Sequence, residues 1–317
     1  MTYIDVFNGD ADGICALHQL RLANPLESQL VTGIKRDIEL LKKVEAATGD
    51  QVTVLDISLD KNRNDLIRLL DAGAEVLYFD HHYAGEIPQH PALETHIDTD
   101  ANMCSALLVN RYLENAYLPW AVVAAFGDNL FTAAQQAASR LNLSEEQLEQ
   151  LKLLGTCLNY NGYGASLADL VYTPDDLYRL VAGYVDPFAF IHEEPGYARL
   201  QEAYYSDFER VQALTPDYAD AHHALYVLPD APWARRISGI YANDLAQQYP
   251  DRAHAMLTVQ PEGGFLVSVR APLNNKCGAD ELCRQFDTGG GRKAAAGINH
   301  LPQEQYDTFV KAFRKAF

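Results

Sequence analysis

The sequence predicts an α/β protein of two domains, the first with a mostly parallel sheet and helices on both faces, the second smaller and also α/β. In the first half of the chain, short apolar runs alternate with helical patterns, which is typical of strand–helix–strand units. A long, polar, tyrosine-rich helical pattern then begins near Pro195, and strand-like and helix-like patterns start again after it. A chain of 317 residues is long enough for two such domains.

The strands expected in the first half are short and apolar, and the helices carry apolar residues at helical spacing. One of these helices has Leu66, Leu69 and Leu70 on one face and ends at Gly73. Another begins with a capping box formed by Ser144 and Gln147. The expected strands are Tyr3–Phe7, Gln51–Leu55 and Glu75–Phe79, and the expected helices are Gly13–Leu22, Lys61–Ala72, Ser105–Leu113, Trp120–Phe126, Ser144–Leu154 and Pro174–Phe190.

The polar helix from Pro195 to Leu214 is expected to connect the two domains. This divides the chain into a first domain of residues 1–194, a connector of residues 195–218 and a second domain of residues 219–317. A glycine-rich segment, residues 288–297, lies between the last two helices expected in the second domain. The expected strands there are His223–Leu228, Ala253–Val259 and Phe265–Arg270, and the expected helices are Ile237–Gln248, Gly278–Gln285 and Pro302–Phe317.

The formal net charge of −18 argues against a partner such as long nucleic acid. Proteins that grip long nucleic acids neutralise many phosphates with basic side chains, whereas this chain as a whole would repel a polyanion. A local basic patch can still hold a short anionic substrate. The five scattered cysteines, the absence of a basic leader and the lack of a membrane-length apolar run predict a cytoplasmic protein with no membrane partner.

Carboxylate and imidazole side chains follow several of the expected strands and helices at the point where each ends. The carboxyl ends of parallel strands meet at one edge of a sheet, which is where ligands bind in open α/β folds. A single aspartate in such a place is more often a turn residue or helix N-cap, so the joint placement carries the prediction. Carboxylates and neutral imidazoles together suit a divalent ion such as Mn²⁺. The residues concerned are Asp10, Asp12, Asp56, Asp80, His81, His82 and Asp128.

These residues and their order resemble the motifs of the DHH phosphoesterase family. Asp10-Ala-Asp12-Gly13 is similar to its first motif, Asp56 to its second, Asp80-His81-His82 to its third and Asp128 to its fourth. The stretch from Asp98 to Ala106 resembles the segment between the third and fourth motifs. In the second half, Gly289 to Gly297 resembles the glycine-rich motif of the first type of DHH-associated domain, and Ser268-Val-Arg270 resembles its substrate-facing strand.

The resemblance implies an active site in the cleft between the domains, with two Mn²⁺ ions or, as an alternative, Mg²⁺. It implies that Asp56 bridges the ions, that Asp10 binds one of them, and that Asp12, His81 and Asp128 bind the other. Asp80 would orient the histidine pair, and His82 would contact the scissile phosphate or protonate the leaving oxygen. The substrate-binding residues implied are His82, Ser268, Arg270, Gly289, Gly290, Gly291 and Arg292.

The sequence departs from the family pattern in two places, next to the first motif and in the glycine-rich motif. Val6 stands where many members have a histidine, and Asn8 stands where others have a ligand. Asn8 could bind a metal ion through its amide oxygen, or the first ion could be lost. In the glycine-rich motif, Arg292 and Lys293 stand where a histidine is common. Successive glycine N–H groups could form an anion nest there, with a plain turn as the alternative.

The expected function is Mn²⁺-dependent, oligoribonuclease-like hydrolysis of short 5′-phosphorylated oligonucleotides, with linear dinucleotides such as pGpG first, to nucleoside monophosphates. Arg270 and Arg292 could engage a guanine edge or a terminal phosphate. Other enzymatic readings are a phosphatase on 3′-phosphoadenosine 5′-phosphate, a cyclic-dinucleotide phosphodiesterase and a single-strand exonuclease. The non-enzymatic alternative is a nucleotide-binding regulator with a degenerate metal site. For the oligomeric state, a homodimer is one possibility.

Overall fold

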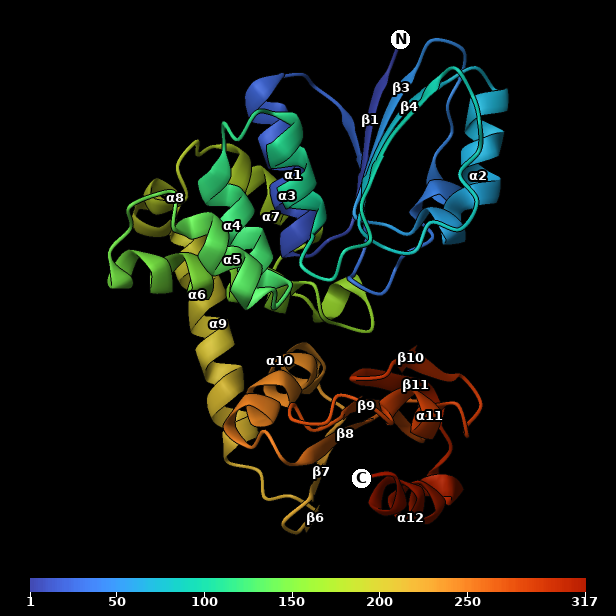
Figure 1. Cartoon of the computed structure of the whole chain (residues 1–317), viewed down its shortest axis with the longest axis vertical. Coiled ribbons are helices and arrows are strands. Elements are labelled where there is room, and N and C mark those ends of the chain that lie inside the picture. The colour runs from blue at the N-terminus through green and yellow to red at the C-terminus, as the bar shows by residue number, and fades with distance from the viewer. The chain divides into compact units, whose positions relative to one another are not determined.

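A computed structural model describes residues 1–317, which divide into two compact units, Met1–Glu202 and Ala203–Phe317. The division falls inside helix α9 (Pro195–Gln212), which the sequence predicts as a connector. The α/β class, the parallel sheet with helices on both faces and a smaller α/β unit at the C-terminus are confirmed (Figure 1).

The N-terminal unit is built on a five-stranded sheet with the order β2-β1-β3-β4-β5, and every neighbouring pair in it is parallel. From β1 the chain moves outward to β2 and then returns to β3 on the other side, so the strand order reverses between β1 and β3. Ligands bind at such a switch point, beyond the carboxyl ends of the strands. The strands are β1 (Tyr3–Phe7), β2 (Gln29–Val31), β3 (Gln51–Leu55), β4 (Glu75–Asp80) and β5 (Leu93–Ile97).

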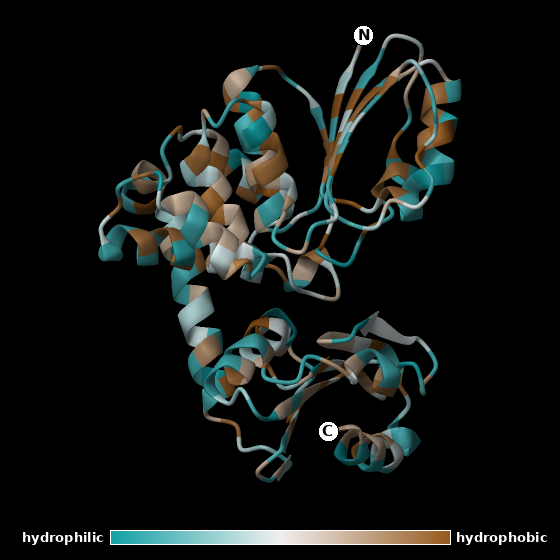
Figure 2. Cartoon of the chain, in the orientation of Figure 1, coloured by the Kyte–Doolittle hydropathy of each residue, from teal (hydrophilic) through white to brown (hydrophobic).

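Helices cover both faces of this sheet, with α2 on one side and α1, α3 and α4 on the other (Figure 1). The central strands β1, β3 and β4 are mostly buried and carry most of the apolar residues of the sheet, whereas the edge strands β2 and β5 are partly exposed (Figure 2). Val6, Val54 and Tyr78 pack against Leu66 and Leu69 of α2. The helices are α1 (Ala11–Ala23), α2 (Leu59–Asp71), α3 (Ser105–Tyr112), α4 (Leu118–Gly127), α5 (Phe131–Ala138), α6 (Glu145–Asn161), α7 (Pro174–Ala182) and α8 (Pro187–Glu193), with 3₁₀ turns at Leu40–Lys43 and Leu167–Asp169.

The single helix expected over Pro174–Phe190 is wrong, because the structure has two helices there. Helix α7 ends at Ala182 and is followed by Gly183, and α8 begins only at Pro187. Proline has no N–H for the preceding turn and forces Asp186 into an extended conformation, so the helix cannot continue through this point. The Asp186 side chain instead caps α8 by accepting the Phe188 N–H at 3.1 Å.

The C-terminal unit has a six-stranded mixed sheet with the order β10-β11-β9-β8-β7-β6, in which only the β7–β8 pair is parallel. Helices α11 and α12 cover one face and bury Val267, Val269 and Ile298. The unit consists of β6 (Tyr218–Ala219), β7 (His223–Leu228), α10 (Pro232–Gln248), β8 (Ala253–Val259), β9 (Phe265–Arg270), α11 (Ala279–Cys283), β10 (Gly289–Arg292), β11 (Ala295–Leu301), a 3₁₀ turn (Gln303–Gln305) and α12 (Tyr306–Ala316).

The glycine-rich segment is not the anion nest or plain turn expected from the sequence. Residues Gly289–Arg292 form β10, an edge strand that pairs antiparallel with β11. In an extended strand, successive N–H groups point in opposite directions, so they cannot converge on one anion as in a nest.

All five cysteines are free, and only Cys277 is exposed. No helix of the chain combines the length and the apolar composition that a membrane span requires.

Candidate metal centre

The predicted acidic and histidine residues lie together at the carboxyl edge of the parallel sheet. Asp10 follows β1, Asp56 follows β3, and Asp80 is the last residue of β4 and precedes the two histidines. Asp128 comes from the end of α4, where it follows the last helical residue. Strands β1 and β3 are the two that flank the switch point, so the fold places these side chains where an α/β sheet binds its ligand.

Two of the aspartates also stabilise helix N-termini. The Asp10 Oδ1 accepts the N–H groups of Asp12 at 3.0 Å and Gly13 at 3.1 Å, which explains why α1 begins two residues before the expected Gly13. The Asp12 carboxylate accepts the Ser105 N–H at 2.7 Å and the Ala106 N–H at 2.8 Å, at the first turn of α3. Each carboxylate oxygen has a second lone pair, so these bonds do not prevent Asp12 from binding a cation.

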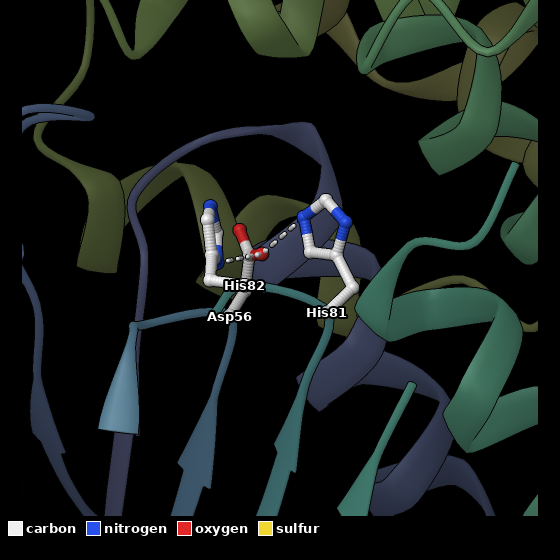
Figure 3. A group of neighbouring side chains, drawn as sticks. All are labelled: Asp56, His81 and His82. Carbon is white, nitrogen blue, oxygen red and sulfur yellow. Dashed lines mark ion pairs between the residues drawn. The ribbon is translucent and has the colours of Figure 1, made fainter. Parts of the chain in front are cut away.

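The His81 ring lies among three carboxylates. Its Nε2 is 3.4 Å from the Asp56 Oδ1, 3.5 Å from the Asp128 Oδ2 and 4.0 Å from the Asp12 Oδ2. One ligand atom each from Asp12, His81 and Asp128 lies within 4.8 Å of the other two, and the same is true of Asp56, His81 and His82. Figure 3 shows His81 and His82 on either side of the Asp56 carboxylate, both facing it. One nitrogen and several carboxylate oxygens at this spacing fit a divalent cation.

Asp56 is held in an unusual backbone conformation at the centre of this group. Its φ angle is +59°, in the left-handed region that asparagine and aspartate tolerate best among residues with a side chain. Burial raises the pKa of its carboxyl well above the ordinary value, and the neighbouring Asp12 and Asp10 add to that effect. Without a cation, the folded chain therefore holds this carboxylate in an unfavourable environment.

His82 is oriented by Asp80, as the family resemblance implies. Its Nδ1 lies 2.7 Å from the Asp80 Oδ1, and its side chain is 45% exposed while Asp80 is fully buried. Burial alone would lower the pKa of His82, but the bond to Asp80 and the Asp80 charge outweigh burial and raise it. An exposed imidazole with a raised pKa, fixed by a buried carboxylate, is suited to proton transfer.

Lys35 is a residue of this site that sequence reasoning missed. Its Nζ forms an ion pair with the Asp10 Oδ2, and it lies 3.3 Å from the Asp128 Oδ1 and 2.8 Å from the Asn159 Oδ1. Burial would raise the pKa of Asp10 and lower that of Lys35, yet the attraction between them lowers the first and raises the second. The signal in the sequence was weak, because Lys35 follows β2, a strand of only three residues.

The residues present therefore fit one divalent ion better than two. The His81 Nε2 lies within 4.0 Å of a carboxylate oxygen of Asp12, Asp56 and Asp128, so these four residues could bind one cation together. The remaining oxygen of Asp10, expected to bind the other ion, is bonded to Lys35. Asn8, which the sequence offers as a further ligand, donates from Nδ2 to the Lys35 carbonyl at 3.3 Å, and its buried Oδ1 has no hydrogen-bond partner. Val6 is fully buried and packs in the core that faces α2.

Four of the six predicted substrate-binding residues of the C-terminal unit share one face of its sheet, whereas Gly289 and Gly291 alternate to the face that α11 and α12 cover. Ser268 of β9 lies opposite Gly297 of β11, which lies opposite Gly290 of β10. Two residues further along β9, Arg270 lies opposite Ala295, which lies opposite Arg292. The register therefore places both arginines and the serine around a floor of residues with little or no side chain, and we call this surface of β9, β11 and β10 the small-residue face.

The fold requires glycine at two of the three glycine positions of β10, for different structural reasons. A Cβ on Gly289 would lie 1.8 Å from the Cys283 carbonyl oxygen, and Gly291 has a φ angle of +138° that favours glycine. A Cβ on Gly290 would meet nothing within 4 Å. Arg270 is held by Asn243 of α10, whose Oδ1 accepts from its Nε at 2.6 Å, whereas Arg292 is exposed.

Comparison with known proteins agrees with these observations. Residues 222–317 match the family model of the DHHA1 domain, and no curated protein sequence matches the chain. A crystal structure of the exonuclease RecJ bound to manganese is similar over 99% of this chain and 90% of its own, with 17% identity and a TM-score of 0.64. RecJ from Thermus thermophilus in complex with Mn²⁺ has 18% identity and a TM-score of 0.62 over 99% of this chain, which spans about half (51%) of that protein.

The pGpG-specific phosphodiesterase PggH from Vibrio cholerae is also similar. The likeness covers 100% of both chains, with 15% identity and a TM-score of 0.59. At these identities, the solved structures establish the fold. The DHHA1 match confirms the expected resemblance for the C-terminal domain.

Proposed function

We propose that this chain, which carries the C-terminal domain of the DHH family, is a metal-dependent phosphodiesterase of short 5′-phosphorylated oligonucleotides. The proposed substrates are linear dinucleotides, pGpG first, and the products are nucleoside monophosphates. The observation that carries the proposal is the group of three carboxylates around His81 at the switch point of the parallel sheet. The five free cysteines support the proposal that the protein acts in a reducing compartment, the cytoplasm.

Asp12, Asp56, His81 and Asp128 are proposed to hold a divalent ion, Mn²⁺ or Mg²⁺. Such an ion would lower the pKa of a water molecule and polarise the phosphoryl oxygens. Asp56 is the central ligand, because its carboxylate faces both histidines and has no lysine or arginine bonded to it (Figure 3).

His82 is proposed to give its proton to the leaving oxygen of the substrate. Water attacks the phosphorus, the bond between phosphorus and the 3′-oxygen of the first nucleoside breaks, and this oxygen takes the proton. Asp80 holds the ring through Nδ1, so Nε2 is the nitrogen free to donate. Protein histidines in this role contribute about 10²- to 10⁴-fold to the rate.

The small-residue face is proposed to bind one end of the substrate. Arg270 and Arg292 on either side of Ala295 offer charged forks suited to a terminal phosphate or a guanine edge. Residues without side chains between them leave room for a flat base. The net charge of −18 supports a short substrate over a long strand, because each additional phosphate adds repulsion.

The activities of the structurally similar proteins support a nuclease or a phosphodiesterase. RecJ is an exonuclease and PggH is specific for pGpG, and the two have comparable similarity to this chain. The lysine contact with Asp10 favours one alternative, a nucleotide-binding regulator with a degenerate metal site. A regulator would bind nucleotides without consuming them.

A substrate panel with Mn²⁺ tests the proposed reaction. It compares pGpG, a cyclic dinucleotide, 3′-phosphoadenosine 5′-phosphate and pyrophosphate, with product identification by chromatography. The proposal expects GMP from pGpG as the main activity. Faster release of phosphate from 3′-phosphoadenosine 5′-phosphate would identify a phosphatase instead. Faster opening of the cyclic compound would identify a cyclic-dinucleotide phosphodiesterase. Binding of nucleotide without any hydrolysis would identify a regulator.

Replacement of Arg292 by alanine tests the small-residue face. Loss of one charged hydrogen bond to the substrate should raise KM by about tenfold or more and leave kcat nearly unchanged. Arg284→Ala is the matched control, since Arg284 is an exposed arginine of the same unit that pairs with Asp280 on α11. An unchanged KM in Arg292→Ala would remove this residue from the binding site.

A further inference from the structure

The Lys35 ammonium occupies a complete binding site among the predicted metal ligands. Lysine has three N–H donors, and here it meets three oxygen acceptors, one each from Asp10, Asp128 and Asn159. The Lys35 side chain is 24% exposed, and the Asp10 carboxylate is 2% exposed. This ammonium therefore lies within the acidic group, not on a solvated surface.

The backbone around Lys35 is fixed on both sides. Its N–H donates to the Gly162 carbonyl at 2.8 Å, and its own carbonyl accepts from the Asn8 side chain at 3.3 Å. The loop approaches β1 so closely that a Cβ on Gly9 would lie 2.1 Å from the Gly33 carbonyl oxygen. Only a glycine at position 9 permits this approach, so the sequence around Asp10 is adapted to the loop that carries the lysine.

The ammonium and a metal ion cannot both use the free oxygen of Asp10. A bound Mg²⁺ or Zn²⁺ lies about 2.0–2.2 Å from a carboxylate oxygen, within the space that the Lys35 Nζ fills beside Asp10. The two cations would also repel each other at that distance. Asp128 connects the two places, since its Oδ1 faces Lys35 and its Oδ2 faces His81.

We propose that Lys35 takes the place of one metal ion, so that this protein works with a single divalent ion and a built-in ammonium. The inference rests on the proposed metal-dependent function and replaces the two-ion centre that the family resemblance implies. Asn8 and Gly9 immediately precede the first family motif: the Asn8 side chain holds the Lys35 loop, and Gly9 leaves room for it. The ammonium would neutralise Asp10 and present a fixed positive charge beside the bound ion.

The test counts Mn²⁺ ions on the intact metal-free protein by calorimetric titration and by electron paramagnetic resonance. The inference expects a single ion per wild-type chain and the six-line spectrum of an isolated Mn²⁺. Lys35→Ala should admit a second ion, with broadening of the spectrum by coupling between ions about 3.5–4 Å apart. Lys35→Arg keeps a cation and should still bind one ion. Lys42→Ala, a change to an exposed lysine in a pair with Glu39, is the matched control.

Two ions with a coupled spectrum in the wild-type protein would overturn the inference. This measurement is made on the wild type, so it does not depend on whether the Lys35 variants fold. A single ion in a folded Lys35→Ala protein would also overturn it, because the ammonium would then not be what excludes the second ion. Metal counting is independent of the substrate. One ion without dinucleotide hydrolysis would reject the proposed function alone, and hydrolysis with two ions would reject this inference alone.

Discussion

The Asp56 side chain is unfavourable for the stability of the metal-free fold but is required by the proposed metal site. Its carboxylate is buried beside other carboxylates, which raises its pKa, and its backbone has a φ angle of +59°. Asparagine tolerates this backbone and removes the charge. Asp56→Asn should therefore lower turnover on the order of 10³-fold and weaken Mn²⁺ binding, because the proposed central ligand is lost.

The same variant should unfold at a higher temperature than the wild type when both are metal-free, because a repulsive buried charge is gone. Thermal unfolding in a chelator, followed by circular dichroism, measures this. A lower midpoint temperature for metal-free Asp56→Asn would show that the carboxylate stabilises the fold without any ion.

The Asp80–His82 pair predicts a pH effect on activity. Asp80 raises the pKa of His82, so the ring keeps its proton to higher pH than a free histidine would. If the protonated ring is the proton donor, activity is lost as pH rises through this raised pKa. Asp80→Asn should move that alkaline limb of the kcat/KM profile to lower pH and reduce kcat by about 10- to 100-fold. A limb that stays in place would exclude His82 as the donor.

At the residue scale, the sequence predicts the acids of the site but not the lysine. Asp10, Asp56 and Asp80 follow strands whose apolar runs are easy to recognise, so their convergence follows from the parallel sheet. Lys35 follows a three-residue strand without a distinctive pattern, and its partners Asp10 and Asn159 are far from it in sequence. Only tertiary structure brings these three together.

At the scale of elements, helices were predictable where local signals agreed with packing. The capping box of Ser144 and Gln147 forms as expected at the start of α6. The helix expected across Gly183 was wrong because periodic apolar residues continue on both sides of the Asp186–Pro187 break. Residues Gly289–Arg292 gave no strand signal, since glycine is unfavourable in strands, and tertiary pairing with β11 decides their conformation.

The edge strand β10 predicts two different outcomes for two neighbouring glycines. Gly290→Ala adds a methyl group where nothing lies within 4 Å, so the fold should be unchanged while KM for pGpG rises. Gly289→Ala would place a Cβ 1.8 Å from the Cys283 carbonyl oxygen, which should destabilise the C-terminal unit by about 1–3 kcal/mol. Chemical denaturation and steady-state kinetics of both variants provide the comparison. An unchanged KM in Gly290→Ala would place the substrate elsewhere.

At the scale of the whole molecule, each unit buries a histidine that must stay neutral. His18 is 1% exposed and His254 is 0% exposed, and burial lowers the pKa of each to about 4 from an ordinary 6.5. Between these values the unfolded chain binds a proton that the folded chain does not. Stability should therefore fall as pH falls from about 6.5 to 4, by roughly 1.4 kcal/mol per pH unit for each histidine.

Urea unfolding at pH 7 and pH 5 measures this dependence. His18→Gln removes one of the two groups and should make the loss on acidification smaller for the N-terminal unit. The matched control is His192→Gln, because His192 is exposed in the same unit and should leave the dependence unchanged. An equal loss in wild type and His18→Gln would assign the effect to other groups.

The acidity of the whole chain supports the short substrate that the proposed function requires. The most direct measurement is kcat/KM with Mn²⁺ for pGpG and for a longer 5′-phosphorylated oligomer of the same base. A dinucleotide phosphodiesterase should act fastest on pGpG and progressively more slowly as the oligomer lengthens, because a chain with a net charge of −18 gains nothing from additional phosphates. A kcat/KM that rises with oligomer length would contradict this account and identify an exonuclease of long strands.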